Sequence, residues 1–291
     1  MSFTNMMFVI DGSMKLIFVV LSAAICSATG LSASLSGRIT GGGTASPGQF
    51  PYVVSITEND RHICGGFIYS SRWIVTAASC VDGKSYTKLN VVAGQVSLIN
   101  PDINEQKMAV YTITIFPEYN STNKLNDVAL LWLTADILFD NDNVDFIPYG
   151  TELQDLAKPR NGIFMGWGAS FDGGAESVNL RYATAVDYPM TAEAICGDYS
   201  NTEFNYLTMM CTGVFLEEPS GSPCQYDEGS PLVQEIPDDP NDLSLPTTTT
   251  AVGIFSKTES CAISSGKSVF TRLSVYYDWF KNTAGLQPTR P

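Results

Sequence analysis

Short runs of β-branched and aromatic residues, separated by turn-forming residues, limit this chain to a strand-rich fold. Asp82-Gly83 and Asp172-Gly173-Gly174 are two of these turns. A hydrophobic share of 44% against 16% charged residues indicates a sizeable core. We therefore expect an all-β fold, either a sandwich or a barrel. The expected strands are Tyr52–Ile56, Trp73–Ala77, Asn90–Ala93, Val110–Ile115, Val128–Leu133 and Gly162–Met165.

Two segments depart from this strand pattern. Residues from about 274 to 282 have helical periodicity, with Ser274 as the N-cap and Val275 and Trp279 four residues apart. The segment Gln234–Thr250 is polar, acidic and rich in Pro and Thr, so we expect a long exposed loop. That loop is either a partner-binding or O-glycosylated segment, or an insertion tolerated at a hairpin tip.

The charge balance disfavours two classes of partner. The net charge of −14 comes from 30 acidic and 16 basic side chains. Such a surface repels nucleic acid and anionic membranes, so we expect neither as a partner. The acidity serves either solubility or the recruitment of a basic partner.

The N-terminal region has the pattern of a secretory signal peptide. Lys15 precedes an apolar run over residues 16–25, and small residues follow through Gly30. The run is too short for a helix that crosses a bilayer about 30 Å thick. We expect a signal peptide over residues 1–30 and a secreted, extracellular protein. Either Met14 is the biological start or the signal peptide is long.

Cysteine usage agrees with secretion. Cleavage removes Cys26 and leaves six cysteines in an oxidising compartment, where three disulfides are expected. Spacing alone does not choose among the fifteen pairings. His62 is the only histidine and stands near no Cys-x-x-Cys pair, so we expect neither a metal nor another cofactor. The sequon Asn120-Ser-Thr predicts an N-glycosylated surface loop.

Several motifs, in order along the chain, together resemble the trypsin/chymotrypsin-like (S1) serine protease family. The resemblance covers the chain from Arg38 to about Phe280. The motifs are Arg38-Ile-Thr-Gly-Gly42, Cys64-Gly-Gly-Phe67, Trp73-Ile-Val-Thr-Ala-Ala-Ser-Cys80, Asn126-Asp-Val-Ala-Leu-Leu131, Gly166-Trp-Gly168 and Cys224-Gln-Tyr-Asp-Glu-Gly-Ser-Pro-Leu-Val233.

The resemblance implies two antiparallel six-stranded β-barrels and a C-terminal helix in a domain over residues 39–285. The N-terminal barrel is expected at about 39–150 and the C-terminal barrel at about 151–272, after a short prosegment over 31–38. It also implies disulfides Cys64–Cys80, Cys196–Cys211 and Cys224–Cys261, which use all six mature cysteines.

Two of the three catalytic positions of that family are substituted. Peptide hydrolysis there needs a serine nucleophile, a histidine base and a buried aspartate that orients the histidine. Ser79 stands at the histidine position, and Glu228 stands at the serine position. Asp127 matches the aspartate but has no imidazole to orient. Losing base and nucleophile together is expected to remove a rate enhancement on the order of 10⁶. A Glu228–Asp127 acid–base pair is the less favoured alternative.

Substrate-binding positions are altered as well. Tyr226 replaces a glycine that, with the residue at Glu228, forms the family's oxyanion hole. Ser256-Lys257-Thr258 replaces a substrate-pairing Ser-Trp-Gly segment, so bulk and charge stand where the peptide enters. Ser222 matches the base of the specificity pocket, so nothing there selects Lys or Arg.

The activation positions are retained. Arg38-Ile39 resembles the family's cleavage junction, and Asp227 matches the aspartate that receives the new α-ammonium group. Either a conformational switch survives without catalysis, or these residues are inherited without use. His62 matches a histidine that contacts this aspartate in family zymogens, so we expect a structural role for it.

Two functional hypotheses follow. The first is a non-catalytic homologue, arthropod-like in its loop composition, that binds a protein or peptide as a cofactor, decoy or regulator of proteolysis. A protease and a protease inhibitor are its candidate partners, and we expect a monomer. The alternative is a serine-type endopeptidase with residual or unconventional hydrolase activity. A decaying paralogue without a present role is a third option.

Overall fold

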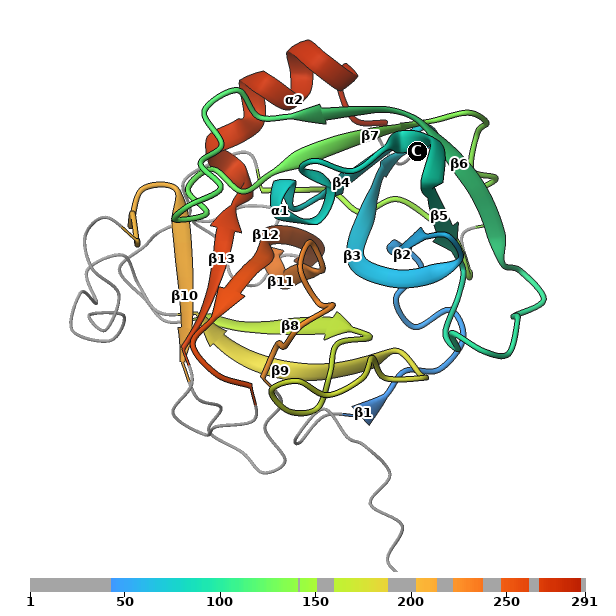
Figure 1. The fold of residues 1–291 in the computed structure, drawn as a ribbon, viewed down its shortest axis with the longest axis horizontal. Helices are drawn as coiled ribbons and strands as arrows, with labels where there is room; N and C mark the ends of the chain where they lie inside the picture. The colour runs from blue at the N-terminus through green and yellow to red at the C-terminus, as the bar shows by residue number, and fades with distance from the viewer. Residues whose placement is uncertain are drawn as a thin grey trace, which may run out of the picture. The chain divides into compact units, whose positions relative to one another are not determined.

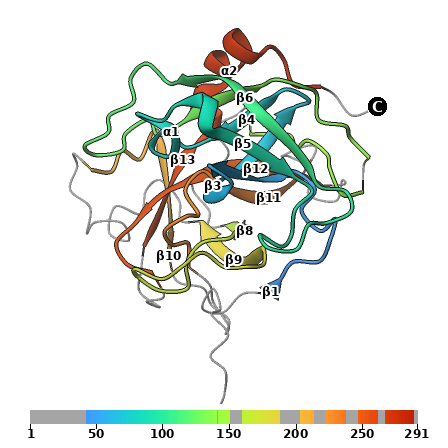
Figure 2. The same cartoon turned by 45° about the vertical axis from the view of Figure 1, so that its right-hand side comes forward.

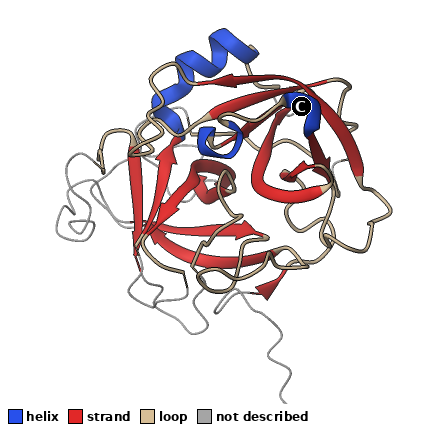
Figure 3. Cartoon of the chain, viewed as in Figure 1, coloured by secondary structure: helices blue, strands red, loops and turns tan. Residues whose placement is uncertain are grey.

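The computed structural model describes residues 43–140, 142–150, 160–187, 203–213, 222–237, 247–261 and 267–288. The predicted signal peptide, the prosegment and the junction Arg38-Ile39 lie outside the described residues, and so does Cys196. Regular structure in the described part is mostly β-strand, with short helices (Figure 3). No helix in this part of the chain is long and apolar enough to cross a membrane.

Six antiparallel strands close into a first barrel (Figure 1). Its interior is lined by aliphatic residues such as Val54, Ile74 and Leu131, each fully buried. β-Branched and other bulky aliphatic side chains pack well on such a pleated, closed surface. In barrel order the strands are β2 (Val53–Glu58), β3 (Arg61–Ser70), β4 (Trp73–Thr76), β7 (Ala129–Leu133), β6 (Gln106–Ile115) and β5 (Leu89–Ala93).

The second sheet closes on itself as well, because β8 pairs with both β11 and β9. The prediction of two six-stranded antiparallel barrels is therefore confirmed. A seventh strand, β1, adds to β9, so this N-terminal segment joins the second sheet although it lies within the range predicted for the first barrel. The order is β1 (Gly43–Thr44), β9 (Arg181–Asp187), β10 (Met209–Gly213), β13 (Ser268–Arg272), β12 (Thr247–Thr258), β11 (Pro231–Pro237) and β8 (Arg160–Gly166).

The predicted loop Gln234–Thr250 is wrong at both of its ends. Residues 234–237 continue β11 and residues 247–250 begin β12, with Gln234 opposite Thr250 and Pro237 opposite Thr247. Strand pairing overrides the polar composition because consecutive threonines suit a pleated strand. Residues 238–246 lie outside the described residues.

The C-terminal helix is present, but it begins differently from the prediction. A 3₁₀ turn, η2 (Leu273–Tyr276), precedes α2 (Tyr277–Ala284). Ser274 lies inside the 3₁₀ turn, and no side chain caps the start of either helix. Phe280 of α2 is fully buried, with its ring centroid 5.9 Å from that of Tyr69 in the first barrel.

A single apolar cluster joins the two barrels. It contains Phe67 and Leu130 of the first barrel beside Trp167, Val233 and Ile254 of the second region, all at most 2% exposed. Close-packed interiors have low compressibility, so this cluster provides a stiff contact between the two barrels. Figure 2 shows short helix α1 (Ala78–Val81) after β4 and the helix α2 from a second side.

Both disulfides that fall wholly within the described residues match the predicted pairing. Cys64 is bonded to Cys80, and Cys224 is bonded to Cys261. Cys211 is also disulfide-bonded, while its predicted partner Cys196 lies outside the described residues.

Candidate functional site

Asp127 anchors one side of the site at the position predicted for the triad aspartate. Its carboxylate is fully buried just before β7 and accepts a 2.7 Å hydrogen bond from the Ser79 backbone N–H. The hydroxyl groups of Ser79 and Ser256 donate to the other carboxylate oxygen at 2.9 Å and 2.6 Å. Burial raises the pKa of Asp127, and these donors act in the opposite direction.

Ser79 is positioned by local structure and by a disulfide. It lies in α1, directly after β4, and the adjacent Cys80 is tied to Cys64 of β3. The side chain that stands at the histidine position is thus a short hydroxyl donor bonded to Asp127. A hydroxyl has no basic lone pair comparable to that of a neutral imidazole, so it does not take a proton from a nucleophile near neutral pH.

Glu228 lies in a tight loop between the second disulfide and β11. Tyr226 adopts φ 75°, a conformation that glycine reaches more readily, and Gly229 adopts φ 82°. The Glu228 carbonyl accepts a 2.9 Å hydrogen bond from the Gly65 N–H, which ties the loop to β3. Gly65 has no room for a side chain, because a Cβ there would lie 1.9 Å from the Ser230 hydroxyl oxygen.

The Glu228 carboxylate folds back onto the backbone of its own loop. The Tyr226 N–H donates to its Oε2 at 2.9 Å, and its own backbone N–H also hydrogen-bonds it. These two N–H groups are the donors that the family motif assigns to the oxyanion hole. A carboxylate of the chain itself therefore lies at the donors that the resemblance predicts for an oxyanion hole.

Burial raises the pKa of Glu228, while the Lys124 ammonium and these backbone donors lower it. The Asp127 charge adds to the rise, so the two carboxylates lie within electrostatic range of each other. Carboxylates that interact in this way resist simultaneous ionisation unless donors and a cation surround them. At both carboxylates, hydrogen-bond donors and the Lys124 ammonium oppose the rise in pKa.

Lys124 supplies that cation and was not singled out by the sequence. It is half-buried in the loop between β6 and β7, and its Nζ donates to the Ser256 carbonyl at 2.9 Å. Its charge also lowers the pKa of Asp127. No local pattern marks this residue, because the contact joins positions 132 residues apart.

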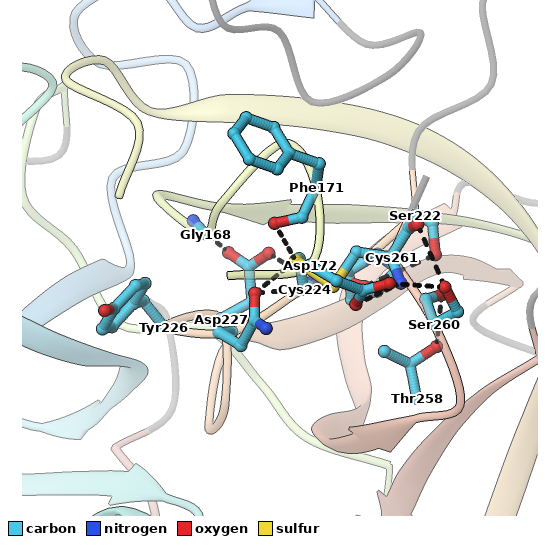
Figure 4. The surroundings of a disulfide bond; sticks show 12 residues. Gly168, Phe171, Asp172, Ser222, Cys224, Tyr226, Asp227, Thr258, Ser260 and Cys261 are labelled. Atoms are coloured by element: carbon cyan, nitrogen blue, oxygen red, sulfur yellow. Dashed lines mark hydrogen bonds between the residues drawn. A yellow bond between two sulfur atoms is a disulfide. The ribbon is translucent and has the colours of Figure 1, made fainter. Parts of the chain in front are cut away.

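Asp227 is fully buried beside the Cys224–Cys261 disulfide (Figure 4). Its carboxylate accepts hydrogen bonds from the Gly168 N–H at 2.6 Å and the Cys224 N–H at 3.0 Å. Gly168 leaves the space for this approach, since a Cβ there would lie 1.9 Å from Asp227 Oδ2. Burial raises the pKa of Asp227 to about 8, and the nearby Glu228 charge adds to the rise.

His62 is a buried structural residue in this geometry. Nδ1 lies 2.8 Å from the Ser55 hydroxyl, and Nε2 lies 3.0 Å from the Tyr226 carbonyl oxygen. The ring thus contacts the residue before Asp227, whereas the resemblance to zymogens predicts a contact with the aspartate itself. Burial lowers the pKa of His62 to about 4, so the ring is neutral near pH 7.

The remaining predicted site residues lie around the second disulfide and on the surface. Ser222 is half-buried, and the Thr258 hydroxyl donates to the Ser260 carbonyl at 3.2 Å. Asn120 is exposed, as a glycosylated residue must be. Asp172, Cys224 and Cys261 place potential metal ligands close together, but both sulfurs are consumed by the disulfide.

The chain forms two closed barrels, and the positions that match the family's triad lie between or beside barrel strands. This arrangement defines a protein of the trypsin-like β-barrel class. The family model described as Trypsin matches residues 39–280, and the chain therefore belongs to the trypsin family.

Relatives and solved structures agree with this assignment. The chain is 32% identical to coagulation factor IX of Oryctolagus cuniculus over 246 residues, which cover 83% of each chain. It is 30% identical to Trypsin-1 of Astacus astacus, covering 84% of this chain and all of that one. A structure titled human heparin binding protein superposes with a TM-score of 0.69 and 26% identity, covering 87% of this chain and 99% of that one.

Proposed function

We propose that this chain is a secreted trypsin-family protein without peptidase activity, which acts by binding a protein or peptide that takes part in proteolysis. The observation that carries the proposal is the Glu228 carboxylate bound to the Tyr226 N–H at 2.9 Å. A substrate carbonyl oxygen would have to displace this anion before any tetrahedral intermediate could be stabilised.

The other groups near the site do not restore the chemistry. The Ser79 hydroxyl donates to Asp127 and is no base. His62 is buried and has both ring nitrogens hydrogen-bonded elsewhere. One structural neighbour is the human heparin binding protein, but the net charge of −14 disfavours a polyanionic ligand for this chain.

The test compares the natural chain, cut after Arg38, with a triple variant carrying Ser79→His, Glu228→Ser and Tyr226→Gly. Amidase and esterase turnover and labelling by a fluorophosphonate probe are measured for both. We expect no turnover and no label in the natural chain. Activity in the triple variant would indicate that the remaining scaffold still supports a site.

The rival function is an unconventional hydrolase in which Asp127 and Glu228 share acid–base work. The observation in its favour is that the charge of Asp127 raises the pKa of Glu228. Glu228→Gln separates the two proposals. Turnover in the natural chain that this variant abolishes would overturn the non-catalytic function.

A further inference from the structure

Two lysines within electrostatic range of the carboxylates cross-link the two barrels. Lys124 Nζ donates to the Ser256 carbonyl at 2.9 Å, and Lys257 Nζ donates to the Asn123 carbonyl at 3.0 Å. Each ammonium group thus binds the carbonyl of the residue that precedes the other lysine. We call this pair of contacts the lysine clasp.

Neither half of the clasp is a loose surface contact. Lys124 and Lys257 are both half-buried. Lys257 Nζ makes a further 2.6 Å hydrogen bond to the Glu203 carbonyl, in the segment that leads into β10. Figures 1 and 2 both show the loop between β6 and β7 beside this segment.

The loop that carries Lys124 is itself well defined. Its backbone closes with hydrogen bonds from the Asn120 N–H to the Leu125 carbonyl at 3.0 Å and from the Lys124 N–H to the Asn120 carbonyl at 2.8 Å. Lys124 adopts φ 58°, so its backbone lies in the left-handed region. Lys124 also lowers the pKa of Asp127 and Glu228, so attraction to these carboxylates further stabilises its ammonium group in this position.

The acceptor on β12 is a strand carbonyl that the sheet leaves open. The register between β12 and β13 shifts between Phe255 and Lys257, so Ser256 has no partner residue on β13. On the other side of β12, pairing with β11 ends at Ile254, so residues 256–258 form an edge there. An open carbonyl beside a strand edge is where an extended peptide adds to a sheet. The Lys124 ammonium already donates to that carbonyl. The hydrogen bonds of Lys257 join β12 to the Asn123 and Glu203 carbonyls.

We propose that the lysine clasp holds the Ser256–Thr258 edge of β12 shut against an extended peptide, so that such a segment of a partner docks there only after the clasp opens. The inference rests on the proposed binding function and specifies how the same site is regulated. Opening breaks two charge-assisted hydrogen bonds of half-buried lysines, and the ligand must replace them.

The test uses the full secreted chain with Lys124→Met and Lys257→Met, which keep most of the side-chain volume. The probe is a Kunitz-type trypsin inhibitor, whose reactive loop is an extended strand, and its dissociation constant is measured by calorimetry. We expect the double variant to bind about tenfold to a hundredfold more tightly than the natural chain. Lys88→Met with Lys281→Met makes the same charge change at exposed positions and should leave binding unchanged.

Equal affinities in the natural chain and the double variant, including no binding by either, would overturn the clasp. Amine reactivity gives a second readout that does not depend on a ligand. In the natural chain, Lys124 and Lys257 should be methylated at least about tenfold more slowly than Lys88, because they are hydrogen-bonded and half-buried. Equal methylation rates also refute the clasp. Failure of the non-catalytic function would appear instead as amide turnover.

Discussion

At the scale of single residues, the site shows how the buried Asp127 carboxylate is satisfied by backbone and hydroxyl donors. Asp127 is fully buried, and a buried carboxylate without donors is strongly unfavourable. Three groups donate hydrogen bonds to this carboxylate: the Ser79 N–H, the Ser79 hydroxyl and the Ser256 hydroxyl. Serine at position 79 therefore suits the buried aspartate, because it supplies two of these donors.

Removal of one of these donors should be costly. We expect Ser256→Ala to lower the free energy of unfolding by about 1–3 kcal/mol, because it leaves part of a buried carboxylate unsatisfied. Urea-induced unfolding measures the change. Ser85→Ala, at an exposed serine, serves as the matched control and should stay within about 0.5 kcal/mol of the natural chain. An equal, small effect for both variants would contradict this account of Asp127.

At the scale of elements, the β11–β12 hairpin is longer than its composition suggests. The two strands remain paired out to Pro237 and Thr247, beyond the start of the acidic segment. Glu235 reinforces the end of the hairpin by accepting a 2.9 Å hydrogen bond from the Thr247 hydroxyl and a 2.5 Å bond from the Thr249 hydroxyl. Cross-strand side-chain pairs of this type stabilise a hairpin end.

This register predicts that a short turn can replace residues 238–246. Replacing residues 238–246 by Asn-Gly should keep the fold, because Pro237 and Thr247 are directly opposed and a two-residue turn joins such strands. We expect the melting temperature, measured by circular dichroism, to change by no more than about 5 °C. A chain that no longer folds would show that the segment contributes contacts of its own. A folded chain that loses its partner would assign the segment to binding.

At the scale of the whole molecule, two buried groups couple stability to pH in opposite directions. Asp227 is favoured in its protonated form because its pKa rises from 3.8 to about 8 on folding. Its stabilising contribution is therefore complete below pH 3.8 and is lost as the pH rises toward 8. His62 is favoured in its neutral form, so its contribution is complete above pH 6.5 and is lost as the pH falls toward 4.

Between pH 6.5 and 8, the contribution of His62 to stability is constant, whereas that of Asp227 still changes with pH. We expect the free energy of unfolding of the chain before cleavage at Arg38 to fall by up to about 1.4 kcal/mol per pH unit in this window. Asp227→Asn should flatten the dependence, which urea titrations at several pH values measure. The same slope in the variant would assign it to another group. Cleavage after Arg38 should also flatten it, if the new α-ammonium group pairs with Asp227.

The all-β architecture, several strands of the first barrel and the pairings Cys64–Cys80 and Cys224–Cys261 could be predicted from the sequence. Strands such as Trp73–Thr76 could be predicted because alternation and β-branching are local properties. The polar composition of residues 247–250 predicts a loop, but these residues pair with β11 as a strand. The helix start was also misplaced, because Ser274 has the right type but lies within a 3₁₀ turn.

Only the tertiary structure decided what the substituted residues do. The hydrogen bond from Tyr226 to Glu228 depends on the positive φ of a tyrosine, which no residue pattern reports. The Lys124 contact with Ser256 and the His62 contact with Tyr226 join positions 132 and 164 residues apart. Sequence periodicity describes neighbours along the chain, whereas such contacts exist only once two closed barrels bring distant loops together.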